Sequence, residues 1–190
     1  MSDIHTEVKN ALAILKQGGI ILYPTDTIWG IGCDATNAEA VEKIYKLKKR
    51  SESKSMILLV DNENRLDRYI ERVPEQAWSL IEYAENPLTI VYEKAKNLPD
   101  NLIAEDGSIA FRVTRDEFCK MLSERLRKPI VSTSANFSGE AYPTTFDEIN
   151  ESILNGVDYV VDWKRQEKNR NKPSSIIRLR NNGQFEFLRK

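Results

Sequence analysis

Apolar and polar positions along the chain follow two different periods in turn. Apolar residues recur every three or four positions over 4–15, 40–47 and 118–126, which is typical of amphipathic helices. Shorter helices are expected over 66–70, from Pro74 onward and around 149–154. Short continuous apolar runs lie between these segments, as expected of buried strands, at 20–22, 56–60, 88–92, 108–114, 130–134 and 158–163.

The alternation of helices and strands predicts an α/β fold with a mixed, strongly twisted sheet. The last two strands, 174–180 and 184–190, should form a hairpin, because Asn181, Asn182 and Gly183 provide turn residues between them. No repeat or linker interrupts the pattern, so a single domain is expected over residues 1–190.

Two capping boxes place helix starts in this pattern. Thr36 precedes Glu39 by three positions, and Thr145 precedes Glu148 in the same way. Gly18 stands where a left-handed residue would end the first helix. These signals predict that helices begin after Thr36 and after Thr145.

Composition narrows the classes of protein only slightly. The chain has 28 basic and 29 acidic residues, so its net charge gives no argument for or against nucleic acid. No apolar run approaches the roughly 18 residues of a membrane span, and the N-terminus lacks the layout of a signal peptide. A cytoplasmic protein without membrane contact is expected.

Cysteine and histidine usage argues against several kinds of site. Cys33 and Cys119 match no metal-ligand spacing and are interpreted as buried apolar residues, with a reactive thiol as the alternative. His5 is the single histidine, which makes a Ser-His-Asp set or a histidine-rich zinc site improbable.

A hydroxyl-rich turn follows the strand at 20–22. Pro24 ends the strand and is followed by Thr25, Asp26 and Thr27, at the end of a strand where α/β folds place ligands. These residues either contact a ligand or cap the turn. The glycines at 30 and 32 favour the first interpretation without deciding it.

Cations gather where the second helix ends. Five of the nine residues from Lys46 to Lys54 are basic, which suits the negative end of a helix dipole. The alternative is a clamp for phosphate or carboxylate, because Lys48 and Arg50 can both turn toward one anion.

Two further features point to an anionic ligand. Arg112 lies inside a strand, where an unpaired charge is costly, so it should meet either a ligand anion or an internal carboxylate. Ser132, Thr133, Ser134 and Asn136 crowd the end of another strand, as a ligand site or as a plain polar loop. The chain has neither a Walker loop nor a dinucleotide fingerprint, so a nucleotide would be bound by basic side chains and hydroxyls. The charged segment 164–172 is a candidate lid.

Five short motifs occur in order along the chain. They are YPTDTIWGIG at 23–32, Lys48-x-Arg50 with Lys54, FRVT at 111–114, STSAN at 132–136 and KPSSIIRL at 172–179. Together they resemble the YrdC/Sua5/YwlC family of L-threonylcarbamoyladenylate synthases, in the form with a single catalytic domain. The resemblance implies a YrdC-like fold, a twisted sheet with helices around a large, positively charged cleft.

The resemblance also implies an enzyme, a nucleotidyltransferase. L-threonine, bicarbonate and ATP would give threonylcarbamoyl-AMP and pyrophosphate, with Mg²⁺ accompanying the nucleotide and no residue singled out as a metal ligand. The product would supply the threonylcarbamoyl group of t6A at position 37 of tRNA. The implied partner is therefore the threonylcarbamoyl transferase machinery, with RNA as a further candidate.

Three sets of site residues are implied by the resemblance. The catalytic set is Lys48, Arg50, Ser134 and Asn136. The ATP and phosphate site contains these four and also Lys54, Ser174 and Ser175. The threonine site is Thr25, Thr27, Arg112 and Thr114.

Two alternatives remain open at this point. One is a YciO-like paralogue, which shares the fold, although Lys48-x-Arg50 and Ser134-x-Asn136 favour the synthase branch. The other is an RNA-binding or ribosome-assembly module that uses a concave basic surface without chemistry.

Overall fold

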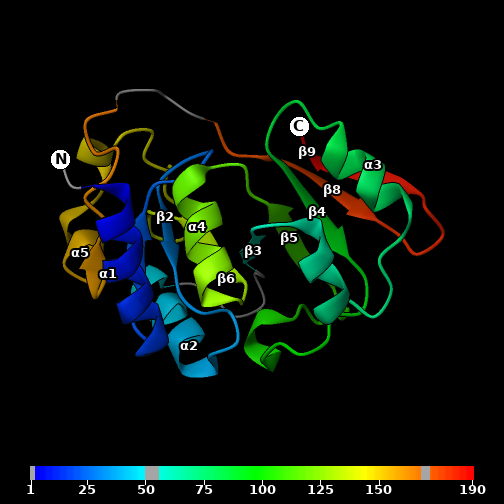
Figure 1. Cartoon of the computed structure of the whole chain (residues 1–190), viewed down its shortest axis with the longest axis horizontal. Coiled ribbons are helices and arrows are strands. Elements are labelled where there is room, and N and C mark those ends of the chain that lie inside the picture. The colour runs from blue at the N-terminus through cyan, green and yellow to red at the C-terminus, as the bar shows by residue number, and fades with distance from the viewer. Residues whose placement is uncertain (1–2, 50–55, 168–171) are drawn as a thin grey trace.

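The computed structural model describes residues 3–49, 56–167 and 172–190. Figure 1 shows its helices and strands. The α-helices are α1 (Ile4–Lys16), α2 (Ala38–Lys48), α3 (Gln76–Glu82), α4 (Glu117–Leu126) and α5 (Glu151–Leu154). The strands are β1 (Ile21–Tyr23), β2 (Gly30–Gly32), β3 (Ile57–Val60), β4 (Leu88–Tyr92), β5 (Ile109–Val113), β6 (Ile130–Ser134), β7 (Tyr159–Val160), β8 (Ser175–Leu179) and β9 (Phe185–Arg189). Short 3₁₀ helices span Glu63–Arg68, Asp100–Leu102 and Phe146–Glu148.

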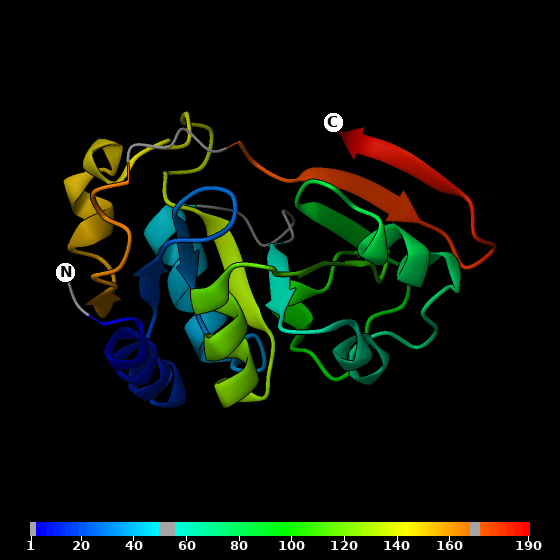
Figure 2. The ribbon, with the colours of Figure 1, turned by 45° about the horizontal axis from the view of Figure 1, so that its top comes forward.

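The strands form one mixed sheet, in agreement with the predicted fold class. Their order is β7-β1-β2-β6-β3-β5-β4-β8-β9. The pairs β1–β7, β3–β5 and β4–β8 are parallel, and the other neighbours are antiparallel. Strand β7 lies at one edge of the sheet and β8 next to the other edge, where the β8–β9 hairpin completes that side (Figure 2).

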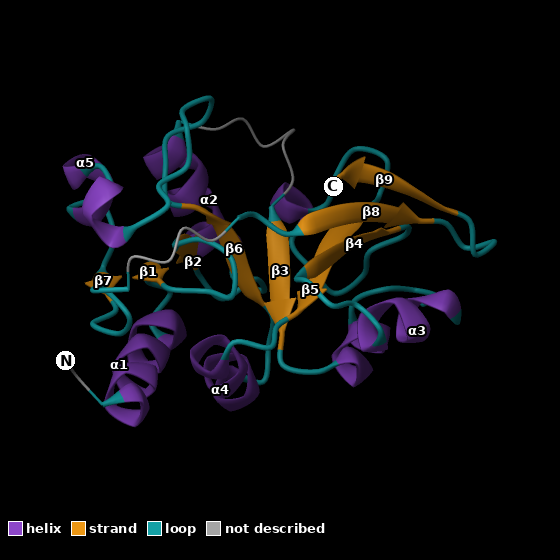
Figure 3. Cartoon of the chain, turned by 90° about the horizontal axis from the view of Figure 1, so that it is seen from above, coloured by secondary structure: helices purple, strands orange, loops and turns teal. Residues whose placement is uncertain are grey.

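Helices lie on both faces of the sheet. Helices α1 and α4 lie together on one face, and α2 lies on the other (Figure 3). The apolar core divides in the same way, because the side chains of α1 and α4 pack with Tyr23 and Leu59, whereas those of α2 pack with Leu22 and Leu58. Neighbouring residues of one strand thus pack into different cores, because successive side chains of a strand point to opposite faces of the sheet.

The strand β2 was missing from the predicted pattern. Its sequence is Gly-Ile-Gly, which has little apolar character, yet it pairs with β1 on one side and β6 on the other. Gly32 explains the choice of residue, since a Cβ atom there would lie 2.3 Å from the carbonyl oxygen of Val131. The glycines therefore allow β2 to enter the sheet rather than only forming a loop.

Both predicted helix starts need correction. Helix α2 is capped by Asn37, whose side chain accepts from the Ala40 N–H, because the Thr36 hydroxyl is bonded to Asp34 instead. After Thr145 the chain forms only the 3₁₀ turn, and α5 begins later with Asn150 as its cap. The helix expected over 66–70 is likewise a 3₁₀ helix, Glu63–Arg68.

The predicted ends at Gly18 and in the hairpin are confirmed. Gly18 has φ +74°, and Gly183 in the β8–β9 turn has φ +85°. Among the described residues, no helix has the length and apolar character needed to cross a membrane.

Candidate active site

A cavity of about 220 Å³ lies where β2, β5, β6 and β8 approach one another. Its polar lining consists mainly of hydroxyl groups and two guanidinium groups. The described lining residues are Thr27, Ile28, Trp29, Gly30, Met56, Ile57, Arg112, Ser132, Thr133, Ser134, Tyr142, Pro173, Ser174, Ile176 and Arg189. None of these described residues is acidic, so the lining suits an anionic ligand with several oxygen atoms.

The two threonines of the predicted turn have different positions. The Thr25 hydroxyl donates to the Ile28 carbonyl at 2.8 Å and accepts from the Thr27 N–H at 3.0 Å, which fixes the turn between β1 and β2. The two hydroxyl oxygens lie 2.9 Å apart. Thr27 lines the cavity and Thr25 does not, while both threonines line a smaller hollow that includes Lys164. The contacts of Thr25 are those of a turn residue, and the expected ligand contacts of both threonines stay a prediction.

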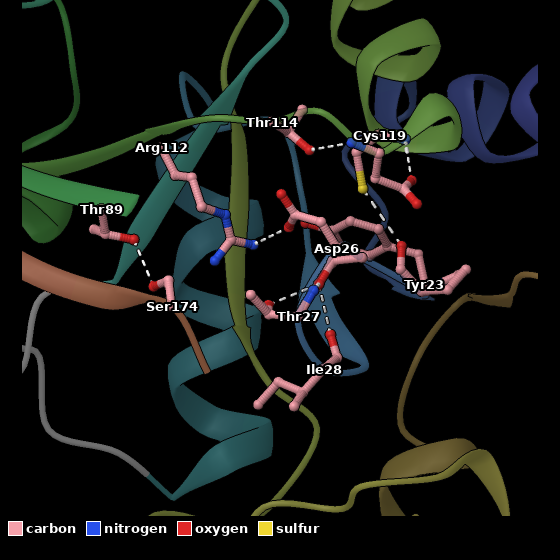
Figure 4. Close-up of polar contacts among 12 residues, drawn as sticks. Tyr23, Asp26, Thr27, Ile28, Thr89, Arg112, Thr114, Cys119 and Ser174 are labelled. Carbon is pink, nitrogen blue, oxygen red and sulfur yellow. Dashed lines mark hydrogen bonds and ion pairs between the residues drawn. The ribbon is translucent and has the colours of Figure 1, made fainter. Parts of the chain in front are cut away.

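Arg112 meets an internal carboxylate and still faces the cavity. Its side chain on β5 is only 3% exposed, and Nη2 lies 3.0 Å from Oδ1 of Asp26 in the turn (Figure 4). This contact is an ion pair without hydrogen-bond geometry, and the buried Nε of Arg112 also has no hydrogen-bond partner among the described residues. Arg112 thus keeps donors for a ligand, although Asp26 already offsets part of its charge.

Ser134 and Asn136 both lie at the end of β6, with different surroundings. Ser134 lines the cavity and stands opposite Gly30 of β2. The amide nitrogen of Asn136 donates to the carbonyl oxygens of Phe137 and Glu140, and its buried Oδ1 has no hydrogen-bond partner among the described residues. Among the described residues only Ser134 of this pair is placed in the cavity wall.

Lys48 is fully buried at the end of α2. Its Nζ donates to the backbone carbonyl oxygens of Ser134 and Asn136. The described lining of the cavity does not include Lys48, so its expected contact with phosphate stays a prediction. Arg50 and Lys54 lie outside the described residues, and so do residues 168–171 of the candidate lid segment.

Two serines at the start of β8 face opposite ways. Ser174 lines the cavity, and its hydroxyl is hydrogen-bonded to that of Thr89 at 2.8 Å (Figure 4). Ser175 lines an apolar groove beside α3 instead, because neighbouring residues of an extended chain alternate in direction. The structure therefore brings Ser174, but not Ser175, to the cavity.

Thr114, expected in the threonine site, is also absent from the described cavity wall. It is buried beyond the end of β5, where its hydroxyl accepts from the Asp116 N–H at 3.3 Å. It lines a separate groove with Asp61 and Lys120. Its geometry is that of a turn residue ahead of α4.

Arg189 is a site residue that the sequence analysis missed. Phe187 pairs with Ile177, and a β-bulge then leaves Leu188 without a partner, so that Arg189 pairs with Ile176 and shares its face toward the cavity. Its guanidinium donates to the Ser174 carbonyl at 2.8 and 2.9 Å. Burial, and then the nearby Arg112, lower the pKa of Arg189. A ladder without the bulge would have directed Arg189 away, and the sequence carries no signal for it.

The two cysteine thiols bring no charged group to the site. Burial raises the pKa of Cys119, which donates to the Pro24 carbonyl, and burial also raises the pKa of Cys33. Both thiols are therefore neutral, as the interpretation of the cysteines as apolar core residues expects. Within the described residues, no group of three or more His, Cys, Asp or Glu side chains could hold a metal ion.

Comparison with known proteins places this fold and site in a family. The model of the Sua5/YciO/YrdC family, described as "Telomere recombination", matches residues 13–190. A threonylcarbamoyl-AMP synthase of Pseudoalteromonas translucida is 36% identical over 165 residues, which are 85% of this chain and 88% of that protein. A putative threonylcarbamoyl-AMP synthase of Methanocaldococcus jannaschii is 36% identical over 178 residues, 91% of this chain and 82% of that protein.

Solved structures show the same fold. Sua5 of P. abyssi, in complex with L-threonine, matches with a TM-score of 0.83 and 24% identity over 94% of this chain, which spans 52% of the Sua5 chain. E. coli YciO matches with a TM-score of 0.83 and 23% identity over 100% of this chain and 91% of YciO. The chain spans about half of the Sua5 structure and nearly all of YciO. The match to the family model over nearly the whole sequence establishes that the chain belongs to the Sua5/YciO/YrdC family.

Proposed function

We propose that this protein is a threonylcarbamoyl-AMP synthase, which converts L-threonine, bicarbonate and ATP to threonylcarbamoyl-AMP and pyrophosphate. The observation that carries the proposal is the cavity lined by hydroxyl groups and by Arg112 and Arg189, without a carboxylate among its described residues. The proposal agrees with relatives that are 36% identical and bear the name of this activity.

The reaction requires positioning more than acid–base groups. The threonine amine and carbon dioxide, formed from bicarbonate, give a carbamate. A carbamate oxygen then attacks the α-phosphorus of ATP, and the bond to pyrophosphate breaks. No covalent enzyme intermediate is needed, which suits a chain with one histidine and with neutral, buried thiols. Rate enhancement would come from orientation and from positive charge around the phosphates.

The cavity allows roles to be assigned to its walls. Arg112 would pair with the threonine carboxylate through its unpartnered donors, while the Thr27 hydroxyl lies on the same side of the cavity. Ser134 and Ser174, on β6 and before β8, would face the nucleotide, with Arg189 beside Ser174. Arg50 and Lys54 are assigned to the phosphates by the family resemblance alone.

Mg²⁺ finds no carboxylate ligand in the described cavity wall. Magnesium in nucleotide sites binds phosphate oxygens and water besides one or two carboxylates. We therefore assign it only to the nucleotide phosphates and derive no step from it. The product would serve t6A synthesis by a transferase that acts on tRNA in the cytoplasm, and the catalytic unit would be the single domain 1–190.

The proposal is tested by pyrophosphate release from ATP, measured with and without threonine and bicarbonate. We expect turnover only when all three substrates are present, and its loss in Arg50→Ala. Lys46→Ala is the control, because Lys46 belongs to the same basic stretch of the sequence and its side chain, in the last turn of α2, is 75% exposed. Folded wild-type protein without threonine-dependent turnover would contradict the proposal.

The same purified protein can be used to distinguish the synthase proposal from the RNA-binding alternative. Binding dominated by phosphate contacts weakens steeply as the salt concentration rises and does not depend on threonine. It should also survive Asn136→Ala. RNA binding with these properties and no pyrophosphate release would replace the synthase proposal. A YciO-like paralogue would show neither threonine dependence nor sensitivity to Arg50→Ala.

A further inference from the structure

Lys48 is the most completely buried cation in the described part of the chain. It is the last residue of α2, and only 1% of its surface is exposed. Lysine side chains are almost never fully buried unless their ammonium group is held by polar partners. Here the described partners are the backbone carbonyl oxygens of Ser134 and Asn136.

The main chain of Lys48 makes a second connection, in which Lys48 accepts the hydrogen bond instead of donating it. The carbonyl oxygen of Lys48 accepts from the Ser138 N–H at 3.0 Å. The next residue, Lys49, has φ +50° and ends the helix, and its Nζ lies 5.2 Å from the centre of the Phe137 ring. The end of α2 is thus joined to residues 134–138 through both the side chain and the main chain of Lys48.

These connections determine the shape of the β6 end. The Ser134 carbonyl oxygen accepts from the Asn136 N–H at 2.9 Å as well as from Lys48, so both hydrogen bonds of this tight turn meet at one oxygen atom. The Ala135 N–H donates to the Trp29 carbonyl at 3.1 Å, which attaches the turn to the segment before β2. Because Ser134 and Trp29 both line the cavity, the turn sets the geometry of that wall.

We propose that Lys48 is a positioning residue, which holds the Ser134–Ser138 turn in its ligand-binding shape, and that it does not itself contact the nucleotide. The inference rests on the proposed function for the ligand, and it changes the role that family resemblance gave to Lys48. Removing the ammonium group would leave the carbonyl oxygens of Ser134 and Asn136, both partly buried, without this donor. The turn would then relax and displace the Ser134 hydroxyl.

The test compares Lys48→Met, which has no donor, with Lys48→Gln, which has a neutral donor. In pyrophosphate release, we expect kcat to fall about 100-fold in Lys48→Met and about tenfold in Lys48→Gln, because displacement of a positioning group by about 1 Å has effects of this size. The KM for ATP should change less than about threefold in both, as a group that makes no contact with substrate requires. Lys46→Met is the control and should match wild type.

Hydrogen exchange of the ligand-free protein provides a readout that does not depend on activity. Faster exchange of the Asn136 and Ser138 amides in Lys48→Met, with unchanged exchange in α4, would support the positioning role in a folded protein. The opposite result would overturn the proposal: kcat falls equally in Lys48→Met and Lys48→Gln, the KM for ATP rises more than about tenfold, and the amide exchange rates do not change. Lys48 would then be a phosphate contact. If the wild type has no threonine-dependent turnover, the proposed function fails, while the exchange rates still decide whether Lys48 holds the turn.

Discussion

At the scale of single residues, the contact between Arg112 and Asp26 shapes the site most directly. A buried guanidinium beside a carboxylate is held in one orientation before any ligand arrives, so less entropy is lost on binding. Asp26 occupies only part of the guanidinium, because Nε has no hydrogen-bond partner among the described residues. The Asp26 carboxylate also offsets part of the positive charge that Arg112 and Arg189 bring to one cavity.

Arg112→Lys tests whether this guanidinium binds the threonine carboxylate. Lysine keeps the charge but loses the planar set of donors, so we expect the KM for threonine to rise about 10-fold to 100-fold, the effect of losing one or two charge-assisted hydrogen bonds. The KM for ATP should change much less. Steady-state pyrophosphate release, with each substrate varied in turn, measures both constants.

The control for this experiment is Arg180→Lys. Arg180 follows β8 and forms an exposed ion pair with Glu186, outside the cavity, so its replacement should leave both constants unchanged. A rise in the KM for ATP that equals the rise for threonine in Arg112→Lys would mean that the guanidinium serves the nucleotide instead.

The residue scale also separates what the sequence can predict from what it cannot. The charge of Arg112 inside a strand predicted a buried anionic partner, because an isolated charge there is too costly. The identity of the partner, Asp26, depends on how the β1–β2 turn meets β5, which no local pattern encodes. Arg189 was missed for a related reason, since a single bulge at Leu188 determines its direction. Thr27, Ser134 and Ser174 line the cavity, and the ligand contacts that the motifs imply for them stay a prediction.

At the scale of elements, the apolar period predicted α1, α2 and α4 well, but their ends depend on individual hydrogen bonds. Gly18 correctly marked the end of the first helix. Helix α4 instead ends at Arg127, with φ +59° and an N–H that donates to the Ser123 carbonyl at 2.9 Å. A left-handed arginine has no sequence signal, because glycine is the residue expected at such a position.

The left-handed conformation of Arg127 predicts that a change to glycine has opposite effects on stability at position 127 and inside α4. Arg127→Gly should increase the free energy of unfolding by about 0.5–1 kcal/mol, since glycine adopts the left-handed conformation without the steric cost. Arg125→Gly, two residues earlier and inside α4, should lower it by about 1 kcal/mol. Denaturant unfolding of both variants measures the two changes, and a loss of stability in Arg127→Gly would show that its side chain outweighs the backbone strain.

At the scale of the whole molecule, one sheet separates two apolar cores, and each core holds one thiol. Cys33 lies in the core beneath α2, and Cys119 lies in the core beneath α1 and α4. Both thiols are buried, and burial raises the pKa of each. A thiol reagent can therefore reach each cysteine only when its own side of the protein opens.

This arrangement tests the proposal that residues 1–190 form one domain. In Cys33→Ala and Cys119→Ala, which each keep one thiol, we expect labelling at least about 1,000-fold slower than in denatured protein, for an unfolding free energy of about 5 kcal/mol or more. The opening free energy at each thiol should equal the global value measured by denaturant for the same variant. The reason is that β1, β3 and β6 contribute side chains to both cores, so neither layer of helices can separate without breaking the sheet. A markedly lower opening free energy at Cys119 would instead show that the layer of α1 and α4 opens independently. The comparison with each variant's own global stability corrects for the small cavity that alanine creates.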